Sequence, residues 1–121
     1  MLREQIVNEA KKIARTTDQA TTPVQLPAFP HIVIAWDTTR RTEMFAGLVR
    51  LAHAFRVSVY ARGKGAESQA REVAESFLGA LVSMPAWIRV RSTRAYKVPA
   101  TDIFCVAMEA EAIEIADSAR M

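Results

Sequence analysis

Cysteine and long hydrophobic runs are nearly absent from this sequence. The single cysteine, Cys105, excludes a disulfide within the chain, and its place in the apolar run "IFCVAM" predicts a small buried side chain. The longest apolar runs fall far short of the roughly 18 residues that a membrane-spanning helix requires. Charges interleave the first fifteen positions, so no secretion signal is expected there. We therefore expect a protein of the cytoplasm, or of a particle assembled there, that contacts no membrane.

The composition is that of one globular domain. Half of the 121 residues are hydrophobic and 24% are charged, and this length buries a core without metal or disulfide. Lys and Arg number 16 against 13 Asp and Glu, a net charge of +3, with the basic excess between Arg40 and Lys97. Such an excess permits contact with DNA or an acidic protein surface but demands neither.

A Gly-Lys-Gly turn between a predicted strand and a predicted helix has the order of a phosphate-binding loop. That loop requires Gly-x-x-x-x-Gly-Lys-Ser/Thr, and no earlier glycine or later hydroxyl completes the pattern around Lys64. We interpret Gly63 and Gly65 as residues that let the strand turn tightly into the helix.

Signs of catalysis or metal binding are also lacking. His31, His53 and Cys105 lie on separate segments without the paired spacing of metal ligands, and no Gly-x-Ser-x-Gly nucleophile motif occurs. Glu109 and Glu111 alternate along an expected strand, which indicates a solvated or partner-facing side. The sequence therefore predicts no catalytic, cofactor-binding or metal-binding residue, and no enzyme.

The first half of the chain yields one helix and two strands. Residues 1–15 carry an amphipathic pattern of helical period, whereas residues 16–30, rich in Pro and Thr, predict an extended crossing segment. Residues 31–36, "HIVIAW", predict a strand, and residues 55–62 alternate with the period of a half-buried strand. Residues 40–54 fit one helical face or a longer strand, and we favour a loop that leads into a strand.

The second half predicts a helix followed by two strands. Residues 66–82 carry an apolar stripe of helical period, and residues 86–93, "AWIRVRST", alternate. Residues 103–115 also alternate, with a one-residue slip that a β-bulge would absorb, although their Ala and Glu content also suits a helix. We expect one α+β domain over residues 1–121, in which residues 31–121 form an antiparallel, mixed-order sheet of about four strands with two amphipathic helices on one face.

This order of elements resembles that of the tail terminator, or tail completion, proteins of long-tailed bacteriophages. In that family an N-terminal amphipathic helix leads to a strand preceded by proline, here "FPHIVIAW". A polar strand with a glycine turn, "FRVSVYARGKG", continues into the helix "AESQAREVAESFLGAL", and "AWIRVRST" and "DIFCVAMEAEAIEI" follow. The resemblance covers nearly the whole chain, and its departures are the long insert "DTTRRTEMFAGLVRLAHA" and the C-terminal segment, which fits a strand or a helix.

The resemblance implies a structural virion protein of the tail-neck region, assembled in the host cytoplasm and without a cofactor. Proteins of this family form hexameric rings that cap the tail tube and contact the tail tube protein and the head completion or connector protein. Genome DNA passes through the lumen of the ring without specific binding. A head-to-tail interface that closes after six copies produces such a ring.

Exposed charges on the expected strands and turn are the candidate contacts with other copies or partners. They are Arg62, Lys64, Arg89, Arg91, Glu109 and Glu111. Mixed charges fix the register between copies, and a free sheet edge pairs with a neighbouring strand. Because phosphate contacts would hold DNA in the lumen, we expect Arg89, Arg91 and Arg94 mostly to face protein.

A second hypothesis uses the basic run from Arg89 to Lys97, which lies near Trp87 and Tyr96. Modules that stack nucleic-acid bases place aromatic and basic side chains on one exposed sheet face. The alternative function is a small basic nucleic-acid-binding or regulatory domain of a mobile element, and salt-sensitive DNA binding would favour it.

Overall fold

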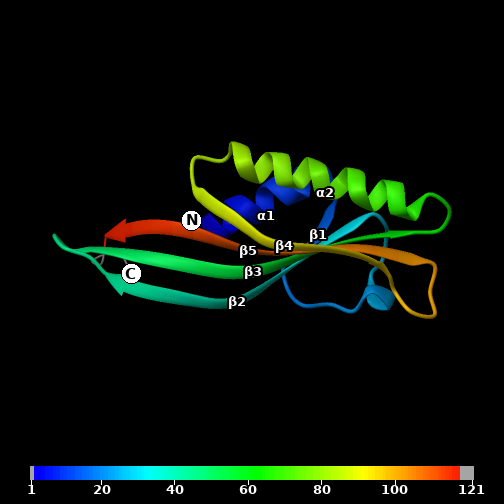
Figure 1. Ribbon diagram of the computed structural model, residues 1–121, viewed down its shortest axis with the longest axis horizontal. Helices are drawn as coiled ribbons and strands as arrows, with labels where there is room; N and C mark the ends of the chain where they lie inside the picture. Colours follow the sequence, from blue (N-terminus) through cyan, green and yellow to red (C-terminus); the bar gives the residue numbers. More distant parts are fainter. Residues whose placement is uncertain (1, 118–121) are drawn as a thin grey trace.

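The fold is a five-stranded mixed sheet with two helices on one face (Figure 1). The structure is a computed structural model that describes residues 2–117. The strands lie in the order β1-β2-β3-β5-β4, with β1 parallel to β2 and every other pair antiparallel. This confirms the predicted α+β class. The sheet has one more strand than expected, because β1 (Arg15–Thr17) pairs with the start of β2.

Both predicted helices are present and cover the same face of the sheet. Helix α1 spans Leu2–Ile13 and helix α2 spans Ala66–Ser83, close to the expected bounds. Gly63 and Gly65 have φ angles of 82° and 78° before α2, a left-handed conformation that glycine adopts without strain, so the interpretation of a tight turn is confirmed. The buried stripe of α2 consists of Ala66, Ala70, Ala74, Phe77 and Leu81.

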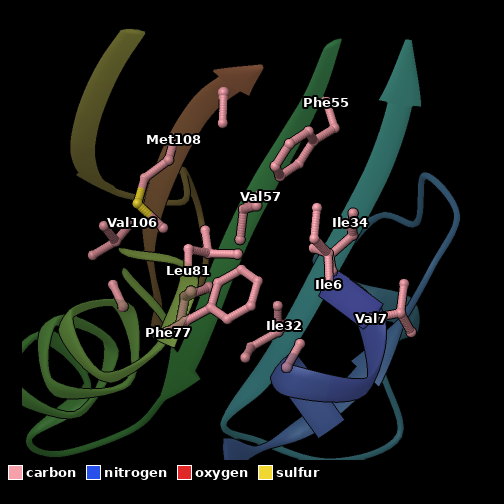
Figure 2. Close-up of a cluster of buried hydrophobic side chains, with 14 of the residues drawn as sticks. Ile6, Val7, Ile32, Ile34, Phe55, Val57, Phe77, Leu81, Val106 and Met108 are labelled. Carbon is pink, nitrogen blue, oxygen red and sulfur yellow. The ribbon is translucent and has the colours of Figure 1, made fainter. Parts of the chain in front are cut away.

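The main core lies between these helices and the sheet. Figure 2 shows the side chains of α1 and α2 pointing at those of the central strands. Its labelled members are Ile6, Val7, Ile32, Ile34, Phe55, Val57, Phe77, Leu81, Val106 and Met108. Burial of this apolar surface is the main term that stabilises the domain.

Strands β2 (His31–Glu43) and β3 (Leu48–Arg62) form one long hairpin. The predicted loop leading into a strand is therefore confined to residues 44–47, and the alternative of a longer strand is correct for residues 40–43 and 48–54. Ala46 and Gly47, with φ angles of 59° and 75°, form the turn of the hairpin. A β-bulge between Trp36 and Thr39 shifts the pairing with β3. The ends of β2, β3 and β5 project beyond the helices (Figure 1), and we call residues 39–43, 48–53 and 112–117 the arm.

Strand β5 (Ile103–Asp117) runs without interruption beside β3, which confirms the strand and contradicts the predicted bulge. The pairing continues in one register from Arg62 opposite Ile103 to Leu48 opposite Asp117. The apolar residues of β5 therefore change side along the strand while the backbone keeps its register. Strand β4 (Trp87–Lys97) pairs with the other side of β5, and it carries the bulge, between Val90 and Ser92.

The face of the sheet opposite the helices, which we call the outer face, is covered at one end only. The crossing segment, with a short 3-10 helix at Pro23–Gln25, folds over that end. It completes a second, smaller core of Leu26, Val33, Tyr60, Ile103 and Cys105. The remainder of the outer face is open, including the part formed by β4.

Cys105 should react with thiol reagents only after unfolding. Its side chain is fully buried, as predicted, and burial raises the pKa of the thiol, so little thiolate forms at neutral pH. We expect the reaction with an aromatic disulfide reagent to be orders of magnitude slower than in urea-unfolded protein. Fast labelling of the native protein would contradict this burial.

His31 should make the fold less stable below neutral pH. Its ring lies 2.8 Å from Thr17 Oγ1 and 3.3 Å from the Ala28 carbonyl, and it ties β1 and the crossing segment to β2. Burial, with a smaller effect of the Arg15 charge, lowers the pKa of His31 below 6.5, its usual value. The unfolded chain then binds more protons between the lowered pKa and 6.5, so stability is lost as the pH falls through that interval.

The corresponding experiment compares melting temperatures at pH 7.5 and 5.5 for the wild type and His31→Gln. The wild type should lose more thermal stability on acidification than the variant, because glutamine does not titrate. Equal losses in both proteins would show that His31 does not cause the pH dependence.

Candidate interaction surface

Four of the six charged residues predicted as contacts lie together on the outer face of β4 and β5. Arg91 donates a hydrogen bond from Nη2 to Glu111 Oε2 over 2.8 Å, and Arg89 stands opposite Glu111 in the strand pairing. Ser92 donates from Oγ to Glu109 Oε2 over 3.5 Å. These contacts lie within one chain, and their role towards other copies stays a prediction.

The other two predicted residues lie at the opposite end of the sheet. Arg62 donates from Nε to Asp102 Oδ1 over 3.1 Å, and its guanidinium lies 5.8 Å from the centre of the Phe29 ring. Lys64 is exposed in the glycine turn. The six predicted residues therefore form two separate groups and no single site.

Because of the bulge in β4, Arg94 lies on the outer face in place of Lys97, which strict alternation would put there. Arg91 has no paired residue on β5, so Arg94 returns to the side of Arg89 and Arg91. We call these three arginines the basic row. Trp87, the first residue of β4, lies on the same side and is 78% exposed. The guanidinium of Arg94 lies 5.1 Å from the ring centre of Tyr96. The sequence offered no signal for this bulge.

An open cleft of about 730 Å³ lies where β5 extends beyond β4. β4 begins at Trp87 opposite Ile113, so residues 114–117 of β5 have no neighbouring strand on that side within the described part of the chain. The apolar lining is provided by Leu2, Met44, Pro85, Trp87, Ile113 and Ile115. Figure 1 shows the end of β5 projecting beyond the start of β4, near the start of α1, whose Leu2 lines the cleft.

Large exposed hydrophobic side chains concentrate at this end of the molecule. Phe45 at the hairpin turn is 83% exposed, Trp87 78%, Ile115 52% and Met44 41%. We call these four residues the end patch. Exposed apolar patches with a polar rim mark interaction sites more often than isolated apolar residues do. Sequence reasoning missed Met44, Phe45 and Ile115, because it placed a loop and a bulge where the arm lies.

A buried polar network crosses the arm on the side of the helices. The His53 ring, 6% exposed, lies 2.9 Å from Thr39 Oγ1 through Nδ1 and 3.3 Å from Glu114 Oε1 through Nε2. Trp36 packs edge-on against it with ring centres 6.5 Å apart. Hydroxyl, imidazole and carboxylate also occur in this order in catalytic triads. Here both ring nitrogens are engaged between three paired strands, and we interpret the network as cross-strand stabilisation.

The described residues 2–117 contain no group of three His, Cys, Asp or Glu side chains arranged to hold a metal ion. Neither helix of that region has the length and apolar character needed to span a membrane. No protein-family model matches the chain, and no curated protein matches it at a significant level.

Proposed function

We propose that the protein is a structural virion protein of the tail terminator, or tail completion, class, which forms a hexameric ring at the end of a phage tail tube. The observation that carries the proposal is the end patch with its cleft. Met44, Phe45, Trp87 and Ile115 are exposed together beside a free segment of β5. A protein that remained alone would leave this apolar surface and these backbone groups in water.

The arrangement of the sheet edges also favours assembly by head-to-tail contact. β4 forms one edge of the sheet, and on the other side β1 pairs with only three residues of β2, so residues 34–43 of β2 have no neighbouring strand there among residues 2–117. The two edges lie on opposite sides of the molecule and differ in sequence. Contacts between unlike surfaces give rings when the rotation closes.

In this proposal the ring contacts the tail tube protein on one side and the head completion or connector protein on the other. DNA passes through the lumen without specific binding. The chain itself supplies surfaces and no chemistry, and it needs no cofactor. Arg62 and Lys64, at the end of the sheet far from the end patch, are proposed contacts with a neighbouring protein.

Native mass spectrometry across a range of protein concentration and ionic strength, with and without duplex DNA, tests the proposal first. We expect a six-subunit species free of DNA. Purified tail tubes that stop growing when the protein is added would then identify the terminator activity. Tubes that elongate at an unchanged rate, with no protein bound at their ends, would contradict it.

A second candidate function follows from the bulge in β4. It places Arg89, Arg91 and Arg94 on the same side as Trp87 and Tyr96, which is the arrangement of a surface that stacks bases and neutralises phosphates. A small nucleic-acid-binding domain would quench Trp87 fluorescence on addition of single-stranded DNA, and its affinity would fall steeply with salt. Unchanged fluorescence at low salt would exclude this candidate.

A further inference from the structure

We propose that one copy of the chain lays the outer face of its β4 along the exposed side of α2 of a second copy. This contact rests on the proposed ring and deepens it, because it names two unlike faces, rather than the two sheet edges, as the surfaces that meet. One surface is Trp87 with the basic row. The other is Val82 with Glu67, Glu72 and Glu75, which we call the acidic row.

Opposite charge of the two surfaces is the first argument. The basic row, Arg89, Arg91 and Arg94, has no acidic residue within β4. On α2 the exposed side carries three glutamates and only Arg71 as a basic residue. Arg91 is paired with Glu111 and Glu67 with Arg71, at 2.8 and 3.7 Å.

Two charges of each sign remain after these pairs are removed. Arg89 and Arg94 on the strand, and Glu72 and Glu75 on the helix, form no ion pair with the described residues 2–117. They are therefore available to pair between copies. Complementary charge of this kind fixes the register of an interface and excludes the wrong partners.

Matching order and length form the second argument. Along β4 an exposed tryptophan is followed by three arginines, and along α2, read from its end, an exposed valine is followed by three glutamates. The glutamates available for pairing, Glu75 and Glu72, lie seven and ten residues before Val82, a rise of about 10 and 15 Å. Arg89 and Arg94 pair with β5 residues two and six positions from the partner of Trp87, or about 7 and 20 Å of strand, so each arginine comes within about 5 Å of one glutamate along the contact.

The direction in which the two rows run allows the same contact to repeat from copy to copy. Only residues 84–86 separate the end of α2 from the start of β4, and Figure 1 shows these two points at the same end of the molecule. Val82, in the last turn of α2, and Trp87, the first residue of β4, therefore lie at that end. The two rows therefore run in the same direction along opposite faces of the domain. A neighbour related by rotation, without being turned end for end, brings tryptophan to valine and arginines to glutamates. Unlike surfaces that meet in this way build rings.

Trp87 is the expected anchor of the contact. It is 78% exposed, it packs into neither core, and it faces α2 of the next copy near Val82, which is 75% exposed, and Gly79. Apart from its chain neighbours and the backbone of its own helix, no described atom lies within 4 Å of the position that a Cβ of Gly79 would take, so an indole ring would find open space there. Tryptophan and arginine are the residues that most often dominate interface energies.

Reciprocal charge reversal tests this contact. One variant carries Arg89→Glu and Arg94→Glu, and the other carries Glu72→Arg and Glu75→Arg. Each variant alone should assemble at least about 100-fold more weakly than the wild type, because like charges meet. An equimolar mixture should recover the wild-type assembly, with equal numbers of the two variants in each ring, which native mass spectrometry resolves by mass.

The matched control is Lys11→Glu with Lys12→Glu, which changes the net charge as the arginine variant does but lies on exposed positions of α1. It should assemble as the wild type does, and circular dichroism should show all variants folded. Trp87→Ala should weaken assembly without a change of fold. A single variant that assembles normally, a mixture that does not recover, or a wild type that stays monomeric at about 1 mM would overturn the contact.

The outcomes separate this contact from the proposed function. Recovery in the mixture with a copy number other than six would support the contact and contradict the hexameric ring. A hexamer that both variants form equally well would support the ring and overturn the contact. Arginine variants that lose only DNA binding, with assembly unchanged, would overturn the contact and favour the nucleic-acid candidate.

Discussion

Replacement of Phe77 by alanine should lower the free energy of unfolding by about 3–5 kcal/mol. The ring is fully buried between α2 and the central strands, so its removal leaves a cavity that the surrounding side chains fill only in part (Figure 2). A domain of this size is stable by about 5–15 kcal/mol, so the variant should be close to unfolding at 37 °C. Urea unfolding followed by circular dichroism measures the difference.

Gln69→Ala is the control on the same helix, because Gln69 is exposed and lies outside the proposed contact. Its free energy of unfolding should remain within about 0.5 kcal/mol of the wild-type value. A loss below about 1 kcal/mol for Phe77→Ala would mean that α2 does not pack on the sheet as described.

Replacement of His53 by leucine should cost about 1–3 kcal/mol of stability, the usual effect of breaking a buried hydrogen-bond network. The change removes the partner that joins Thr39 on β2 to Glu114 on β5 through β3. The loss should come from the arm, so hydrogen exchange should accelerate there before it does in β3 beneath the helices.

A double-mutant cycle with Thr39→Val isolates the network. The cost of His53→Leu should be smaller when Thr39 is already valine, with a coupling of at least about 0.5 kcal/mol. Additive effects of the two changes would indicate that the side chains do not interact, and a more stable His53→Leu variant would contradict the stabilising role of the network.

The two helices were predictable from the sequence because each presents one apolar stripe of helical period to the sheet. The arm was not, because the residues from Asp37 to Glu43 are polar and exposed and therefore carry no period. Their extended conformation depends on pairing with β3, a tertiary contact that overrides weak local preference. The glycine at position 47 is a local signal for the hairpin turn, but it suits a loop equally well.

The candidate surface was predictable in part for a similar reason. The charges of Arg89, Arg91, Glu109 and Glu111 were recognised from alternation, and the structure brings these four together. The position of Arg94 depends on a bulge, which backbone pairing decides. The His53 network joins residues that are 14 and 61 positions apart, and no sequence pattern connects them.

Close packing of α2 on the sheet gives the domain a fixed thickness between the two surfaces of the proposed contact. Ala66, Ala70 and Ala74 are small, so α2 packs closely on the sheet and holds the two rows at a fixed angle to each other. In the proposed ring, that angle would set how far each copy turns relative to the last, and so the number of copies that closes the circle. Charged residues would then set how tightly neighbours bind each other, whereas the three buried alanines would set the curvature.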